Sequence, residues 1–123
     1  MASSPKIRWV RVLIAGVLAE ILVFLVVFPT LHFFGQRAFL VSILIASAVM
    51  PFLLAIWVGR HIDSGFALHG ALVGLVAALF YVVLTRGRPE PQLYIIAHGL
   101  KVIGGAVGGL VAARRNASAR SLV

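Results

Sequence analysis

Long apolar runs separated by short polar stretches dominate the order of residues along this chain. Four such runs cover about residues 7–34, 38–58, 66–84 and 93–113. A helix of roughly 20 mostly apolar residues is long enough to cross the hydrocarbon core of a bilayer. The stretches between the runs hold glycine, proline and charged residues, which interrupt helices. The pattern predicts an all-α, four-helix transmembrane bundle that forms a single integral membrane domain over residues 1–123.

The composition indicates that lipid, not water, surrounds these runs. Hydrophobic residues make up 62% of the chain and charged residues 11%, with a mean hydropathy of +1.10. Soluble domains carry about 25% charged residues, so a water-soluble fold is not expected. The chain has no cysteine, which excludes disulfides and metal sites with cysteine ligands.

The net charge of +8 comes from basic residues that lie almost entirely at the ends of the apolar runs. Such residues set membrane orientation, so we interpret them as topology signals and expect no nucleic-acid partner. Because the connections are short, we expect consecutive helices to be antiparallel neighbours. One side then holds Lys6, Arg8, Arg11, Arg60, Arg114, Arg115 and Arg120, and the other holds Arg37, Arg86 and Arg88. The positive-inside rule predicts that both termini of this multi-pass protein face the cytoplasm.

Small residues recur at a spacing of four in the first, third and fourth runs, as in a glycine zipper. Small residues let membrane helices approach closely, and close contact is what holds such helices together. The pattern predicts either packing of the third and fourth helices within one chain or an interface between copies, and both remain open. The glycines that we expect to pack helices are Gly16, Gly70, Gly74, Gly104, Gly105, Gly108 and Gly109.

A proline lies inside the second apolar run. Pro51 has no backbone N–H, so the carbonyl of Ser47 loses its usual partner within the helix. We expect a kink at Pro51, with the Ser47 hydroxyl or a neighbouring helix satisfying the freed backbone.

Two ionisable residues lie deep within the apolar runs. With about 1.5 Å of rise per residue, Glu20 lies roughly 16 Å from Trp9 and Lys101 roughly 18 Å from Ala113, near the midplane of a bilayer. A charge there costs about 2.5 to 3.5 kcal/mol on insertion scales, and such charges usually pair inside the bundle. One hypothesis is therefore an ion pair between Glu20 and Lys101 across packed first and fourth helices.

The alternative is a lone, protonated Glu20 and a Lys101 that reaches the outer interface by snorkelling. Side chains lean toward the amino end of their own helix, so in antiparallel helices these two heads would diverge. His98, one turn from Lys101, either extends a relay toward the outer surface or is neutral and bonded to a carbonyl. We identify no catalytic residue, metal site or cofactor motif, because no nucleophile with a base and no metal-binding cluster is present.

The segment AGVLAEI around Glu20, in a chain of four apolar runs, resembles the small multidrug resistance transporters. In that family a first-helix glutamate exchanges protons for cationic drugs in a homodimer, which implies for Glu20 a role as proton and substrate acceptor. The third run departs from the family because it lacks a tryptophan beside its glycines, and Lys101 would oppose a cationic substrate. Taken whole, with HGALVG in the third run and IGGAVGG in the fourth, the chain resembles uncharacterised four-helix bacterial membrane proteins, which implies a fold but no activity.

These observations favour a non-catalytic integral membrane protein, a helix-packing or accessory subunit without a cofactor. Its expected partners are the lipid bilayer and either a second copy of the chain or another membrane protein. The alternative is a proton-coupled transporter of a small solute or cation that uses Glu20, tuned by Lys101 and His98.

Overall fold

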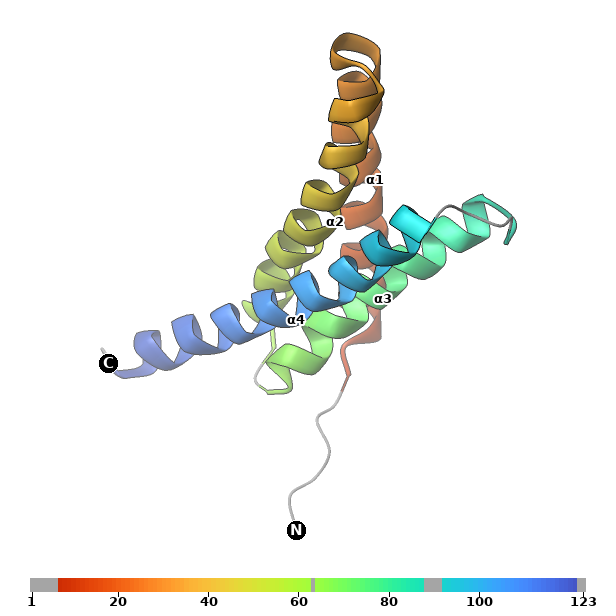
Figure 1. The fold of residues 1–123 in the computed structure, drawn as a ribbon. Coiled ribbons are helices and arrows are strands. Elements are labelled where there is room, and N and C mark those ends of the chain that lie inside the picture. The colour runs from red at the N-terminus through yellow and green to blue at the C-terminus, as the bar shows by residue number, and fades with distance from the viewer. Residues whose placement is uncertain (1–6, 63, 88–91, 122–123) are drawn as a thin grey trace.

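The computed structural model describes residues 7–62, 64–87 and 92–121, with side chains up to residue 118, and the described chain is almost entirely helical (Figure 1). Each of its four helices is long and apolar enough to cross a membrane. The predicted all-α class is therefore confirmed, and so is the prediction of four apolar helices. The helices are α1 (Trp9–Phe34), α2 (Gln36–Gly59), α3 (Phe66–Leu84) and α4 (Gln92–Ser121).

Two helix boundaries differ from those expected from the apolar runs. Helix α2 begins directly after Gly35, whose φ of 87° lies in a region that favours glycine, so a single residue separates α1 from α2. Helix α4 continues past the expected end at residue 113 to Ser121. Its last turns are polar but contain no glycine or proline, and alanine and arginine are strong helix formers.

The four helices form two sequential pairs that cross each other. Figure 1 shows the two pairs diverging from each other. The α1–α2 pair runs to the turn at Gly35, and the α3–α4 pair runs to the end of α3 at Leu84 and the start of α4 at Gln92. Both α1 and α4 pack against α2 and against α3, which also contact each other. Within the described residues α1 and α4 share no backbone contact, so they lie at opposite corners of the bundle.

The end of the bundle away from the divergence is closed by small aliphatic side chains. Val12, Ala15, Val58 and Val73 are fully buried there, with Ile62 beside them. A second buried cluster, toward the diverging ends, consists of Val23, Val27, Ile43, Ala46 and Ala97.

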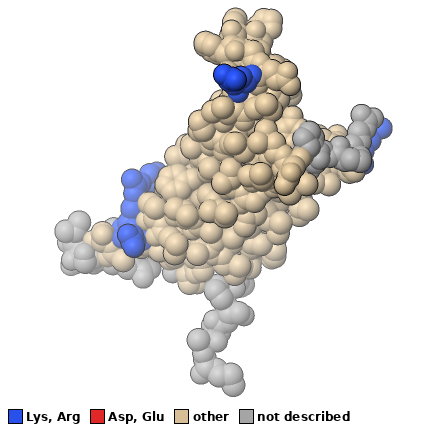
Figure 2. Space-filling view, in the orientation of Figure 1, with Lys and Arg blue, Asp and Glu red and all other residues tan. Residues whose placement is uncertain are grey.

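The outer surface is apolar between charged ends. In Figure 2 the Lys and Arg side chains lie toward the extremities of the molecule, and the face between them shows uncharged residues. Large apolar side chains such as Phe33 and Phe34 are about three-quarters exposed, at 74% and 76%. A surface of this kind is compatible with lipid, because apolar side chains in contact with hydrocarbon do not need to be buried within the protein.

Glycines form the contacts of α3 with α4. Gly70 lies against the backbone of Gly105 and Gly109, and Gly74 lies against the backbone of Lys101. A Cβ atom added to Gly70, Gly74 or Gly105 would overlap the opposing backbone. The two helices can approach this closely only because these positions lack side chains.

The neighbouring glycine series of α4 faces a different helix. Gly104 lies against Ala48 of α2, and Gly108 lies against Phe52 of the same helix. In α1, Gly16 packs against α3 at Val73 and Val76. The structure therefore places the seven small-residue positions within the chain's own helix contacts.

Candidate functional site

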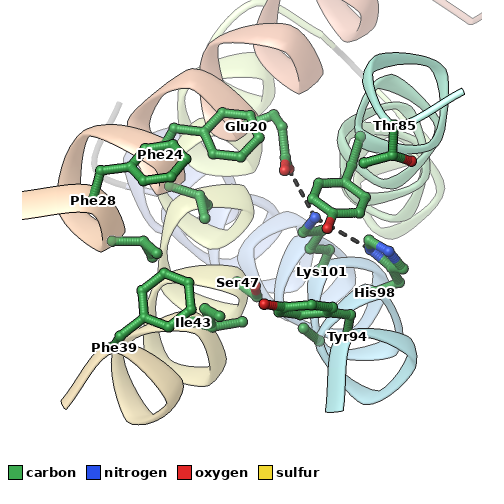
Figure 3. Close-up of a pocket in the computed structure, with 14 residues that line it drawn as sticks. Glu20, Phe24, Phe28, Phe39, Ile43, Ser47, Thr85, Tyr94, His98 and Lys101 are labelled. Carbon is green, nitrogen blue, oxygen red and sulfur yellow. Dashed lines mark hydrogen bonds and ion pairs between the residues drawn. The ribbon is translucent and has the colours of Figure 1, made fainter. Parts of the chain in front are cut away.

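The two deeply placed charges meet in the interior of the bundle (Figure 3). The ammonium Nζ of Lys101, from α4, lies 2.8 Å from the carboxylate Oε2 of Glu20, from α1. Both side chains are buried, with 3% of Lys101 and 1% of Glu20 exposed. Since α1 and α4 share no backbone contact within the described residues, this ion pair spans the long diagonal of the bundle.

The heads of the pair converge, although the depths estimated from the helix ends suggested that they would diverge. Lys101 packs on α3 at Gly74, and Gly16 packs on α3 between Val73 and Val76. Because both residues pack at the same height along α3, Lys101 lies level with Gly16, which is one helical turn before Glu20 in α1. With this offset, two side chains that each lean toward the amino end of their own helix lean toward each other. Lys101 does not snorkel to the surface.

The ammonium group has further partners on the side away from Glu20. Its Nζ donates a hydrogen bond to Nδ1 of His98 at 3.2 Å, and it lies 5.1 Å from the centroid of the Tyr81 ring. The Tyr81 and His98 rings are 5.0 Å apart. Because Nδ1 accepts from the ammonium, it carries no hydrogen, so His98 is a neutral base in this arrangement. A carboxylate, an imidazole and an aromatic face thus replace the water that Lys101 lost on burial.

A pocket of about 280 Å³ lies between the diverging halves of the helix pairs and reaches the ion pair. Its lining includes the charged pair together with His98 and Ser47. The rest of its wall is mostly apolar, as Figure 3 shows. The aromatic side chains that line it are Phe24, Phe28, Phe39, Tyr81 and Tyr94. Pockets for small molecules have this character, an apolar wall with a few polar groups that set orientation.

Ser47 presents an unused hydroxyl to this pocket. Helix α2 continues through Pro51, which is buried, and the Ser47 side chain is also buried at 1% exposure. Within the described part of the chain its Oγ has no hydrogen-bond partner. This hydroxyl therefore does not satisfy the backbone freed by Pro51, whereas the alternative, a contact from a neighbouring helix, stays a prediction. The Oγ remains available to a bound molecule.

His69 forms a separate polar contact at the closed end of the bundle. Its Nδ1 lies 2.7 Å from the carbonyl oxygen of Gly65, and its Nε2 accepts the backbone N–H of Arg8 at 3.2 Å. The ring is buried and neutral, with Nδ1 as donor, and it joins the start of α1 to the start of α3. Among the residues that the structure describes, no three His, Cys, Asp or Glu side chains are grouped so that they could hold a metal ion.

The structure brings Glu20, Lys101 and His98 together, and it adds two residues that the sequence did not assign to this site. Tyr81 contacts the ammonium group, and Ser47 lines the pocket. Tyr81 lies in an apolar run and is an ordinary interfacial residue by pattern. The sequence pointed to Ser47 only through its position one turn before Pro51, where a polar group in a membrane helix requires a partner.

Comparisons of the chain with protein-family models, with curated proteins and with solved structures gave no match in any of the three. The two resemblances drawn from sequence motifs are therefore not supported by a match. The geometry of the site is the basis for the function proposed below.

Proposed function

We propose that this chain is a non-catalytic, multi-pass protein of the bacterial inner membrane that acts as an accessory subunit. In this proposal the four helices run antiparallel and both termini are cytoplasmic. The distribution of Lys and Arg supports the orientation, with seven on the side of the termini against three on the other. The exposed apolar surface between the charged ends is the area available to lipid or to another membrane protein.

The observation that carries the accessory role is the buried pair of Glu20 and Lys101. Each charge neutralises the other in the interior, and the pair joins α1 and α4 where their backbones do not meet. A static bundle gains specificity from such a pair, because only one arrangement of the helices satisfies both groups. The glycine faces are occupied within the chain, so a partner would contact the aliphatic perimeter.

The accessory role is tested by extracting the protein at native abundance in a mild detergent that retains lipid. We expect a complex of fixed stoichiometry with one other membrane protein, recovered equally from either partner. Substitution of exposed perimeter residues, for example Leu79→Trp, should dissociate the complex without unfolding the bundle, because Leu79 is 54% exposed. Recovery of a monodisperse monomer with lipid alone would contradict the role.

A second function, proton-coupled transport of a small solute, is favoured by the pocket. The pocket leads to Glu20 from the diverging ends of the helices, whereas Val12, Val58 and Val73 fill the opposite end. In alternating access a carrier opens its binding site to one side of the membrane while the other side is closed. A pocket with one open and one closed end matches one of these two states. Glu20 would then exchange a proton when its contact with Lys101 breaks.

Transport is tested with purified protein in vesicles that carry a pH gradient. Proton-driven flux should appear with the native chain and be lost in Glu20→Gln, which keeps the shape of the side chain and cannot bind the proton. Ser42→Ala is the matched control, since Ser42 lies on α2 outside the pocket and bonds only the carbonyl of Phe39. Equal flux in Glu20→Gln and in the native chain would remove this function.

A further inference from the structure

The pocket combines an apolar body with a single polar end. At about 280 Å³ it lies just below the range of about 300 to 1,000 Å³ that is usual for small-molecule sites. That volume suits a compact molecule better than a whole lipid. Five of the fourteen lining residues are phenylalanine or tyrosine, and their rings favour an aromatic or branched aliphatic body.

The polar part of the pocket lining includes two hydrogen-bond donors, Lys101 and Ser47. The Lys101 side chain runs toward His98, one turn nearer the amino end of α4, where Tyr94 also lines the pocket. The Lys101 ammonium group thus lies on the side of His98, which also lines the pocket, and the buried hydroxyl of Ser47 has no partner in the described chain. Both can donate to one acceptor group, and a carboxylate is the group that Lys101 already holds.

Charge balance determines which ligand the pocket takes. The titratable groups that face Glu20 are Tyr81 from α3 and Lys101, His98 and Tyr94 from α4, while α2 contributes only the Ser47 hydroxyl. One acid and one base make the resting site neutral. A cation would add charge beside Lys101, and an anion beside an ionised Glu20 would leave an uncompensated negative charge in a desolvated site. Neutrality is kept when an anion binds and Glu20 takes up a proton.

We propose that the pocket binds a compact aromatic or branched aliphatic monocarboxylate, whose carboxylate replaces that of Glu20 on Lys101 while Glu20 takes up one proton from water. The bound anion accepts hydrogen bonds from Lys101 and Ser47, and its apolar body lies among the phenylalanine rings. Binding and protonation are then linked, so each favours the other by the same factor. This site goes beyond the accessory role and does not depend on it, because it concerns binding and requires no flux.

The test measures binding to the full chain in lipid nanodiscs by calorimetry. The probes are 1-naphthylacetate, its uncharged amide, and 1-naphthylmethylamine, which share one apolar body and differ in charge. We expect the acid to bind, with uptake of about one proton seen as a difference between buffers of unlike ionisation enthalpy. Its Kd should rise roughly tenfold per pH unit wherever Glu20 is ionised in the free protein. Equal binding of acid and amide, or preference for the amine, would overturn the proposal.

Variants separate the residues' contributions. Glu20→Gln should bind the acid with no dependence on pH, and Lys101→Met should lose binding at least tenfold. Ser47→Ala should weaken binding roughly two- to tenfold, the usual effect of one hydrogen bond, and Ser42→Ala should leave it unchanged. If Lys101→Met does not fold, the pH dependence of the Kd of Glu20→Gln tests the proposal. A dependence equal to that of the native chain would refute the coupling of acid binding to protonation of Glu20. A chain that fails to form a complex yet binds the acid would remove the accessory role alone.

Discussion

Neutralising one member of the buried ion pair should destabilise the protein strongly. Glu20→Gln removes the carboxylate that lies 2.8 Å from the Lys101 ammonium. At that separation and an effective dielectric constant near 20, the attraction is about 6 kcal/mol. Desolvation of the two groups offsets part of it, so the expected loss is about 3 to 5 kcal/mol, the usual result of leaving one buried charge alone. His98 and Tyr81 still face the ammonium and favour the lower end of that range.

The double variant tests whether the two charges act on each other. Lys101→Met shortens the side chain by one atom and removes its charge, and it should cost about as much as Glu20→Gln. When both are replaced, no unpaired charge remains, so the combined loss should be smaller than the sum of the single losses by about 0.5 to 3 kcal/mol. Glu20 and Lys101 reside on helices without backbone contact, so backbone shifts contribute little to this difference.

The free energy of unfolding can be measured by steric trapping in lipid bicelles, with the native and variant chains under one condition. Arg37→Met is the charge control, because Arg37 is exposed at the start of α2 and should change stability by no more than about 0.5 kcal/mol. Strictly additive losses in the double variant would refute the contact between the two charges.

Three further changes test the packing and the topology. Gly70→Ala should lower stability by more than about 1 kcal/mol, because the added Cβ would overlap the backbone of α4. Gly99→Ala should be neutral or stabilising, since nothing lies near that position. Equal thermal unfolding of the two variants would contradict the close contact of α3 with α4. His69→Ala removes both ring hydrogen bonds at the closed end and should cost about 1 to 3 kcal/mol by the same assay; unchanged stability would show that the ring is dispensable. Single cysteines at Gly35 and Ser64 should label from opposite sides of intact cells, and equal labelling from outside would exclude the proposed orientation.

Most of the fold could be predicted from the sequence, because few backbone conformations are stable in the hydrocarbon core of a bilayer. A run of roughly 20 apolar residues in lipid must satisfy its own backbone, and the helix is the form that does so. The start of α2 and the polar end of α4 were missed, the latter because apolar periodicity stops there but helix propensity does not.

The site was only partly predictable. Glu20 and Lys101 stand out because charges are rare in apolar runs, and that rarity suffices to nominate a pair. Their relative depth could not be obtained by counting from the helix ends, because it depends on how far each helix slides along α3. Contacts at Gly16 and Gly74 set that offset. The pocket was not visible either, since it arises from the crossing of two helix pairs, which periodicity alone does not specify.

The separation of the ion pair along the chain has a consequence for biogenesis. Glu20 lies on the first of the four helices and Lys101 on the fourth, so α1 is synthesised before α4. Until α4 has been inserted, the nascent protein holds an acid that only a proton or water can accommodate, and a product truncated before α4 never loses this defect. The buried acid of α1 is thus neutralised only when α4 joins the bundle, so a bundle without α4 differs from the four-helix one in holding an unpaired carboxyl group.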